Sequence, residues 1–133
     1  MVKIDCNKCE NSCCKNKLLN PYLLPSEEKL FKKFSEKAET TKKVLLLKRN
    51  KDGNCIFLDE KDKCKIYKKR PFDCRLYPIL LNFKDKKPYI WVDRKFCPNS
   101  GEIILNERKI LKTIKSLNLP ENWVKDFEKW GAY

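Results

Sequence analysis

Cysteine is the residue type that most constrains this chain, which has eight cysteines and no histidine among its 133 residues. Half of the cysteines lie close together near the N-terminus: Cys6, Cys9, Cys13 and Cys14. Thiolates are the ligands that Zn(II), Cu(I) and iron–sulfur clusters prefer in proteins. Because no imidazole is available, a metal bound here would be ligated almost entirely by sulfur. The cysteine content therefore predicts a metal site.

The sequence also permits a disulfide framework, since the cysteine count is even and small secreted domains use disulfides to compensate for thin cores. The first residues, from Met1 to Cys6, contain neither the apolar run nor the small-residue cleavage site of a secretory signal. Apolar runs elsewhere are shorter than the roughly 18 residues that a membrane span needs. We therefore expect a cytoplasmic protein with no membrane partner, in which the thiols stay reduced and metal binding is favoured over disulfides.

The length predicts a single domain, residues 1–133, that is large enough to bury a hydrophobic core. Within it, residues 6–98 hold the cysteine motifs and residues 101–130 form a helical tail. The formal net charge is +13, and lysine supplies most of the excess. The densest basic stretch consists of Lys61, Lys63, Lys65, Lys68, Lys69 and Arg70. Such a surface is either solvated or in contact with an anionic partner, and charge alone would give nucleic-acid affinity without base readout.

The N-terminal half predicts one helix and one hairpin. Ser26 precedes two glutamates, which suit the positive end of a helix dipole, so a helix is predicted from Ser26 to about Lys37. The apolar run 44–49 predicts a strand. An Asp-Gly pair within residues 50–54 is a strong hairpin signal, so residues 55–58 are predicted to form the returning strand.

The C-terminal half predicts a second hairpin followed by two helices. Residues 78–83 and 89–92 are apolar runs separated by a polar turn at 84–87. Apolar residues repeat at 3.6-residue spacing from 103 to 117, which predicts a helix, and a last helix is predicted over 121–130. Its aromatic residues fall on one face and are expected to pack in the core: Trp123, Phe127 and Trp130. The predicted fold is a small cysteine-rich α+β domain with short antiparallel hairpins and a helical C-terminus, organised around a cysteine metal site.

The spacing of the cysteines constrains the kind of metal centre. The Cys6-x2-Cys9 turn can aim two sulfurs at one ion, whereas the adjacent Cys13 and Cys14 point in opposite directions in extended chain. The adjacent pair therefore suits two centres or two atoms of one polynuclear cluster. The other four cysteines are Cys55, Cys64, Cys74 and Cys97, with gaps of 8, 9 and 22 residues. These gaps are wider than in a zinc finger and differ from the ferredoxin pattern, so the ligands are expected on different elements, in two four-sulfur sites or one multinuclear site.

A long motif in the middle of the chain carries a family resemblance. It reads Gly53-Asn54-Cys55-Ile56-Phe57-Leu58, and then Cys64-Lys65-Ile66-Tyr67-Lys68-Lys69-Arg70-Pro71-Phe72-Asp73-Cys74-Arg75-Leu76-Tyr77-Pro78. With the N-terminal cysteines, it makes residues 6–98 resemble the CxxCxxCC family of zinc- or iron-chelating domains. The chain departs from the pattern in having three residues between Cys9 and Cys13, and Lys63 where a small residue is more usual. Neither departure removes a candidate ligand.

The resemblance implies which residues bind the metal and what the metal does. Seven cysteines match as ligands: Cys6, Cys9, Cys13, Cys14, Cys55, Cys64 and Cys74. Cys97 is an eighth candidate. The family includes flagellin lysine N-methylases, larger proteins for which an iron–sulfur cluster and methyl transfer are implied. Further residues match the motif: Tyr67, Arg70, Pro71, Asp73, Arg75 and Tyr77. They are either scaffolding around the ligands or, for Arg70 and Arg75, cofactor-binding residues that hold an anionic substrate or cofactor carboxylate beside the metal.

Three functions are compatible with these features. The first is an iron–sulfur protein, with a 4Fe-4S cluster preferred and zinc as the alternative, used for redox or group-transfer chemistry that includes methyl transfer. The second is a structural zinc domain whose basic surface contacts nucleic acid or another anionic partner, and the third is a metal carrier. Conventional catalysis has little support, because without histidine there is no Cys-His or Ser-His pair and no Gly-rich phosphate loop is present. No residue pattern identifies the chain as an enzyme.

Overall fold

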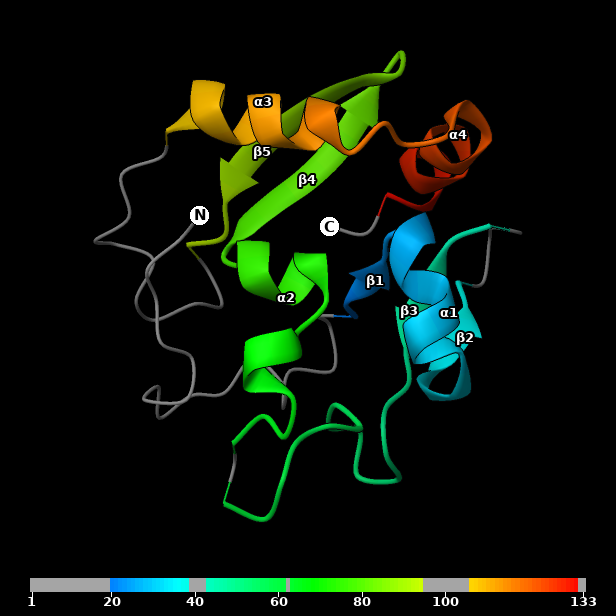
Figure 1. The fold of residues 1–133 in the computed structure, drawn as a ribbon, viewed down its shortest axis with the longest axis vertical. Coiled ribbons are helices and arrows are strands. Elements are labelled where there is room, and N and C mark those ends of the chain that lie inside the picture. The colour runs from blue at the N-terminus through cyan, green and yellow to red at the C-terminus, as the bar shows by residue number, and fades with distance from the viewer. Residues whose placement is uncertain (1–19, 39–42, 62, 95–105, 132–133) are drawn as a thin grey trace.

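The structure is a computed structural model that describes residues 20–38, 43–61, 63–94 and 106–131. The chain forms a three-stranded antiparallel sheet, a separate two-stranded hairpin, and several helices, two of them near the C-terminus (Figure 1). The predicted α+β class, with antiparallel strands and a helical C-terminus, is confirmed. No helix within the described ranges is long and apolar enough to cross a lipid bilayer.

The three-stranded sheet is built from short strands that lie apart in sequence. Strand β3 (Leu45–Leu47) is central, and β1 (Tyr22–Leu23) and β2 (Ser35–Lys37) flank it in antiparallel register. The strand predicted over 44–49 is therefore confirmed in its central part. The sequence does not predict β1, because a two-residue strand carries no periodicity.

The first predicted helix is shorter in the structure and ends at Phe34 rather than near Lys37. It consists of three helical turns in succession: η3 (Pro25–Glu27), α1 (Glu28–Phe31) and η4 (Lys32–Phe34). Ser35 is extended, and its hydroxyl donates to the carbonyl oxygen of Lys32 at 3.0 Å. Because β2 starts at Ser35 and finds its hydrogen bonds in β3, sheet pairing overrides the local helical pattern.

The Asp-Gly turn is formed as predicted, but the strand after it is not. The turn closes where the Asn50 N–H donates to the Asn54 carbonyl oxygen at 2.8 Å. Cys55 then pairs with Arg49 in an isolated bridge, and the Ile56 N–H donates to the Lys48 carbonyl oxygen at 3.2 Å. The Leu58 N–H donates to the carbonyl oxygen of Cys55 at 3.0 Å, so the chain turns again at once. The predicted strand over 55–58 is therefore wrong.

The second hairpin consists of β4 (Ile79–Lys84) and β5 (Lys87–Val92), close to the predicted strands. The turn uses only two residues, Asp85 and Lys86, instead of four, so β4 is shifted by one residue and β5 begins two residues earlier than expected. Both residues have positive φ, 52° and 69°. This is the backbone of the tight turns whose twist matches that of a hairpin.

Two helices follow the hairpin in sequence. α3 (Glu107–Ser116) confirms the helix predicted over 103–117, of which residues 103–105 lie outside the described ranges. The side chain of Asn106 caps α3 by accepting a hydrogen bond from the Lys109 N–H at 3.2 Å. α4 (Glu121–Trp130) has the predicted bounds. In Figure 1, α3 runs across the hairpin and α4 lies beside β4.

Aromatic residues of α4 lie at the centre of the larger core. Phe127 is fully buried, and its ring centroid lies 4.7 Å from that of Tyr22, 5.1 Å from that of Trp123 and 5.7 Å from that of Phe83. Trp130 is partly buried and packs against the same ring. The predicted core role of these helix residues is confirmed. Since Tyr22 belongs to β1 and Phe83 to β4, the cluster joins the sheet, the hairpin and α4.

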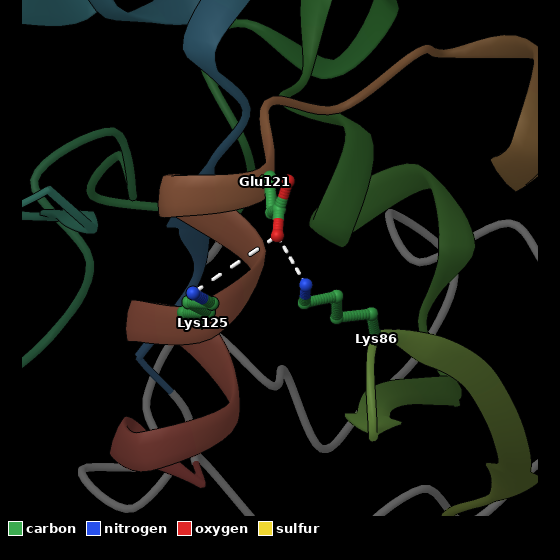
Figure 2. A network of polar contacts seen from close by, with 3 residues as sticks. All are labelled: Lys86, Glu121 and Lys125. Carbon is green, nitrogen blue, oxygen red and sulfur yellow. Dashed lines mark hydrogen bonds and ion pairs between the residues drawn. The ribbon is translucent and has the colours of Figure 1, made fainter.

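Polar contacts also join the hairpin turn to α4 (Figure 2). Lys86 in the turn forms an ion pair with Glu121 at the start of α4, and the Lys125 ammonium lies 4.0 Å from the same carboxylate. The hydrogen bond and charge of Lys86, together with the charge of Lys125, lower the pKa of Glu121. Because all three side chains are exposed, we expect these pairs to orient the turn more than to stabilise the fold.

Candidate metal centre

Three of the predicted ligands border one small apolar cluster. Cys55 is 6% exposed and lies among buried apolar side chains: Leu23, Phe31, Leu47 and Phe57. Cys64 and Cys74 are half-buried and pack against the same cluster. No disulfide joins any two of these three cysteines. The structure thus brings together cysteines that are separated by 8 and 9 residues in the sequence.

A polar turn returns the chain from Cys55 to Cys64. The side chain of Asp59 accepts hydrogen bonds from the N–H groups of Lys61 and Lys63, at 2.8 and 2.9 Å. An aspartate that binds nearby backbone in this way replaces a regular turn and tolerates few substitutions. Cys64 then pairs with Leu58 in an isolated bridge. The carboxylate of Asp59 therefore holds the loop between Cys55 and Cys64 in its turn conformation.

Cys74 lies in the short helix α2 (Phe72–Leu76), which is braced by Arg70. The guanidinium of Arg70 lies 4.0 Å from the ring centroid of Tyr67, and its Nε donates to the Tyr67 carbonyl oxygen at 2.9 Å. Its Nη1 also reaches the Cys74 carbonyl oxygen at 3.5 Å. Arg75 is exposed, with its guanidinium carbon 6.0 Å from the Phe72 ring centroid. Arg70 is thus engaged by its own loop, whereas Arg75 extends toward solvent.

Two carboxylates fasten β1 and the turn after it to α2. Buried Asp73 accepts a hydrogen bond from the Tyr22 N–H at 3.2 Å. Glu27 accepts one from the Phe72 N–H at 2.8 Å and another from the Leu24 N–H at 2.9 Å. Charge-assisted bonds of this kind are stronger than neutral ones. They hold the segment that leaves the N-terminal cysteine motif against the helix that carries Cys74.

The role of Glu27 is a functional feature that sequence reasoning missed. Its partner Phe72 lies 45 residues away, and no local pattern reports such a contact. Its bond to the Leu24 N–H is the carboxylate half of a capping box, but leucine has no side-chain acceptor for the other half, so the sequence lacks the usual signal. Another missed contact is the hydrogen bond from the Tyr77 hydroxyl to the buried Asp93 carboxylate at 2.7 Å.

Replacing Glu27 by alanine is expected to lower the free energy of unfolding by about 2 kcal/mol, because two backbone N–H groups lose a charged acceptor. Urea unfolding followed by circular dichroism measures this loss. Glu28→Ala, the same substitution one residue along at the start of α1, is the matched control and is expected to cost less than about 1 kcal/mol. Equal losses in the two variants would contradict the assigned role.

The Tyr22 side chain is buried beside the same carboxylates. Burial raises the pKa of Tyr22 well above its usual value, and the charges of Asp73, Glu27 and Cys74 raise it further. Its hydroxyl has no hydrogen-bond partner among the described residues. A buried hydroxyl without a partner costs free energy, so this position is occupied by a residue that is not optimal for stability.

We expect Tyr22→Phe to stabilise the fold by about 1 kcal/mol at neutral pH, since it removes the unsatisfied hydroxyl and keeps the ring. The variant is also expected to lose less stability at high pH. Above about pH 10 the unfolded tyrosine loses its proton while Tyr22 in the fold retains it, which lowers the stability of the unsubstituted chain by about 1.4 kcal/mol per pH unit until the raised pKa is passed.

Urea unfolding at neutral and alkaline pH tests this expectation. The exposed Tyr89 provides the control, because Tyr89→Phe removes a hydroxyl that is not buried and should leave the stability at neutral pH unchanged. A Tyr22→Phe variant that is destabilised by more than about 1 kcal/mol would mean that the hydroxyl is satisfied after all.

The remaining predicted ligands lie outside the described residues: Cys6, Cys9, Cys13, Cys14 and Cys97. Within the described ranges, no three cysteine, aspartate or glutamate side chains are grouped so that they could hold a metal ion by themselves. The basic stretch of the sequence is placed on the loop before α2, where five lysines are exposed: Lys61, Lys63, Lys65, Lys68 and Lys69. Arg70, its sixth member, is half-buried against Tyr67.

Comparison with known proteins identifies the relatives of this cysteine arrangement. Residues 5–98 match the family model described as "CxxCxxCC: Putative zinc- or iron-chelating domain". An uncharacterised protein of Methanocaldococcus jannaschii, MJ0661, is 41% identical over 59 residues, which is 44% of this chain and 32% of that protein, so the chain spans about one third of its length. No solved structure matches the chain. With more than half of its residues covered by the family model, the chain belongs to the CxxCxxCC family of zinc- or iron-chelating domains.

Proposed function

We propose that this protein holds an iron–sulfur cluster of the 4Fe-4S type, bound by cysteine thiolates. The observation that carries the proposal is the convergence of Cys55, Cys64 and Cys74 on one apolar cluster. Cys55 and Cys64 lie in isolated bridges of a loop-rich segment and Cys74 lies in α2, so three separate points of the fold present cysteine at this cluster. The other ligands would come from the rest of the cysteines: Cys6, Cys9, Cys13, Cys14 and Cys97.

The position of β1 supports a centre shared by the two groups of cysteines. Cys14 precedes Tyr22 by eight residues, and a chain of that length spans at most about 28 Å when fully extended. Asp73 and Glu27 hold the end of this segment beside α2, and the neighbouring Leu23 belongs to the apolar cluster around Cys55. A segment of this length is long enough to let Cys14 reach the other three cysteines. Because the described ligands do not form a site alone, the proposal requires this contribution.

The donor set fits an iron–sulfur cluster better than a zinc ion. A 4Fe-4S cluster and a structural zinc ion each take four protein ligands, but the adjacent Cys13 and Cys14, which point apart in extended chain, suit a centre with several metal atoms better than one tetrahedral ion. The apolar side chains around Cys55 would limit the access of water, which is one of the ways in which a protein sets the redox potential of a cluster. When bound, the cluster would supply electron transfer, or an iron atom with an open position for group transfer that includes methyl transfer.

The two arginines of the motif would have different roles. Arg70 braces the turn into α2 through Tyr67 and the Cys74 carbonyl oxygen, so its contribution is to position Cys74. Arg75 follows Cys74 directly and is exposed, so its guanidinium is available to bind an anionic substrate or a cofactor carboxylate beside the centre.

The test is to purify the protein without oxygen, record its visible spectrum, and measure iron, sulfide and zinc per chain. The proposal predicts a brown protein with about four irons and an equal amount of sulfide. A colourless protein with one or two tightly bound zinc ions would overturn the cluster and favour a structural zinc domain. A protein with paired thiols and almost no metal would overturn metal binding altogether.

A further inference from the structure

The hairpin of β4 and β5 has two chemically different faces. Side chains alternate between the faces of a strand, and the antiparallel register gives the pairs that share a face. The inner face carries the core residues Ile79, Leu81, Phe83 and Ile90. The outer face carries three cross-strand pairs: Leu80 with Trp91, Asn82 with Tyr89, and Lys84 with Lys87. An aromatic strip therefore leads to a pair of lysines at the turn.

The aromatic strip is partly open to solvent. Tyr89 is 43% exposed, and its ring stacks on that of Trp91 with the centroids 5.5 Å apart and the planes at 22°. Because Trp91 covers one side of the tyrosine ring, the other side is directed along β5 toward the position of Lys87. A flat aromatic group that stacked there would extend the pair by one ring.

The lysines at the end of the strip differ from their neighbour in the turn. Lys86 is held by the Glu121 carboxylate of α4 (Figure 2), whereas Lys84 and Lys87 are exposed and form no ion pair within the described ranges. Two exposed ammonium groups next to a stacking surface are complementary to an anion that carries a ring. The net charge of +13 adds to the attraction.

We propose that the outer face of this hairpin binds single-stranded nucleic acid. A base stacks on the open side of Tyr89, and the phosphates next to that base contact Lys84 and Lys87. Asn82, opposite Tyr89, uses its side-chain oxygen to accept the Phe83 N–H at 2.8 Å, so its NH2 group is oriented as a donor for the base edge. This surface is formed entirely by described residues, and the inference does not depend on the metal centre.

A single strand fits this surface better than a duplex. The bases of a duplex are stacked on one another, so their faces are closed to a tyrosine ring, whereas a single strand offers each face to a protein. The lysine-rich loop before α2, at the opposite end of the molecule in Figure 1, has the charge for phosphates but presents no stacked aromatic pair among its described residues. The hairpin face combines both features.

The test measures binding of fluorescein-labelled oligothymidine to the intact metal-loaded protein by fluorescence anisotropy, at salt concentrations from about 50 to 200 mM. Tyr89→Ala is expected to weaken binding by roughly fivefold to a hundredfold, the loss of one stacked base. Tyr89→Phe, which retains the ring, should stay within about twofold of the unsubstituted protein. Replacing Lys84 and Lys87 together by glutamine should reduce the slope of log affinity against log salt by roughly 1.4, or about 0.7 per phosphate contact.

Three outcomes would overturn the proposal. One is the absence of binding at the lowest salt concentration, and another is equal binding by Tyr89→Ala and the unsubstituted protein. The third is that the double variant Lys65→Gln/Lys68→Gln loses binding while Tyr89→Ala loses none of it. That result would place the contact on the loop before α2. Phosphatidylserine vesicles serve as a second probe, because a hairpin face that bound vesicles and not the oligonucleotide would be a membrane contact. Circular dichroism and metal content confirm that each variant is folded.

Discussion

Replacing Phe127 by alanine is expected to lower the free energy of unfolding by about 3–5 kcal/mol, the range for a large aromatic residue removed from a well-packed core. Phe127 is fully buried and its ring contacts those of Tyr22, Phe83 and Trp123. These partners come from β1, β4 and α4, so the cavity left by the substitution would loosen the junction of all three elements. Urea unfolding followed by circular dichroism measures the loss.

Phe34 provides a matched control, since the same substitution there removes a ring that is 37% exposed and contacts the ring of Phe57 at 5.0 Å. Phe34→Ala is expected to cost about 1 kcal/mol. If the two variants lost similar amounts of stability, the aromatic cluster around Phe127 would not be the centre of the core. If Phe127→Ala does not fold at all, Phe127→Leu supplies a milder substitution for the comparison.

The second large effect is expected at Cys55. Cys55→Ala should lose most of the bound metal, because it removes a proposed sulfur ligand from the apolar cluster that three cysteines border. The loss of metal should be accompanied by a fall in stability, since binding energy at a structural metal site is also folding energy. Metal per chain, measured on protein purified without oxygen, is the readout.

Leu47→Ala separates loss of a ligand from loss of packing. Leu47 is 2% exposed and belongs to the same cluster as Cys55, but it has no sulfur. Its replacement is expected to cost about 2–3 kcal/mol and to leave the metal content of the folded protein unchanged. Should Cys55→Ala keep its full metal content, Cys55 would be a packing residue, and the candidate site would have to be built from the other cysteines.

The elements that could be predicted from the sequence are those with a long or chemically distinct pattern. α4 has a helical repeat of large aromatic residues, and the second hairpin has two apolar runs around a polar turn, so both were predictable. The end of the first helix could not be predicted, because residues 35–37 are extended only through their pairing with β3, which lies further along the chain. The strand predicted over 55–58 failed for the opposite reason, since the turn after Cys55 removes that segment from its partner.

The sequence identifies the candidate ligands of the site, but not the contacts that support them. The motif identifies Cys55, Cys64 and Cys74, and the structure brings them to one apolar cluster. The carboxylate bonds that hold β1 to α2 join residues that are 45 and 51 positions apart, and a single sequence carries no signal for such pairs. Asp73 could be recognised from its place in the motif as scaffolding, but its partner, the Tyr22 N–H, could not.

X-ray absorption at the iron and zinc edges of the anaerobically purified protein tests the central claim, that cysteine thiolates hold the metal, most directly. The expected result is a tightly bound metal whose directly bonded neighbours are all sulfur, at about 2.3 Å, with iron atoms as the next neighbours if the centre is a cluster. Neighbours that are mainly oxygen or nitrogen would contradict it, as would a folded protein that binds neither metal.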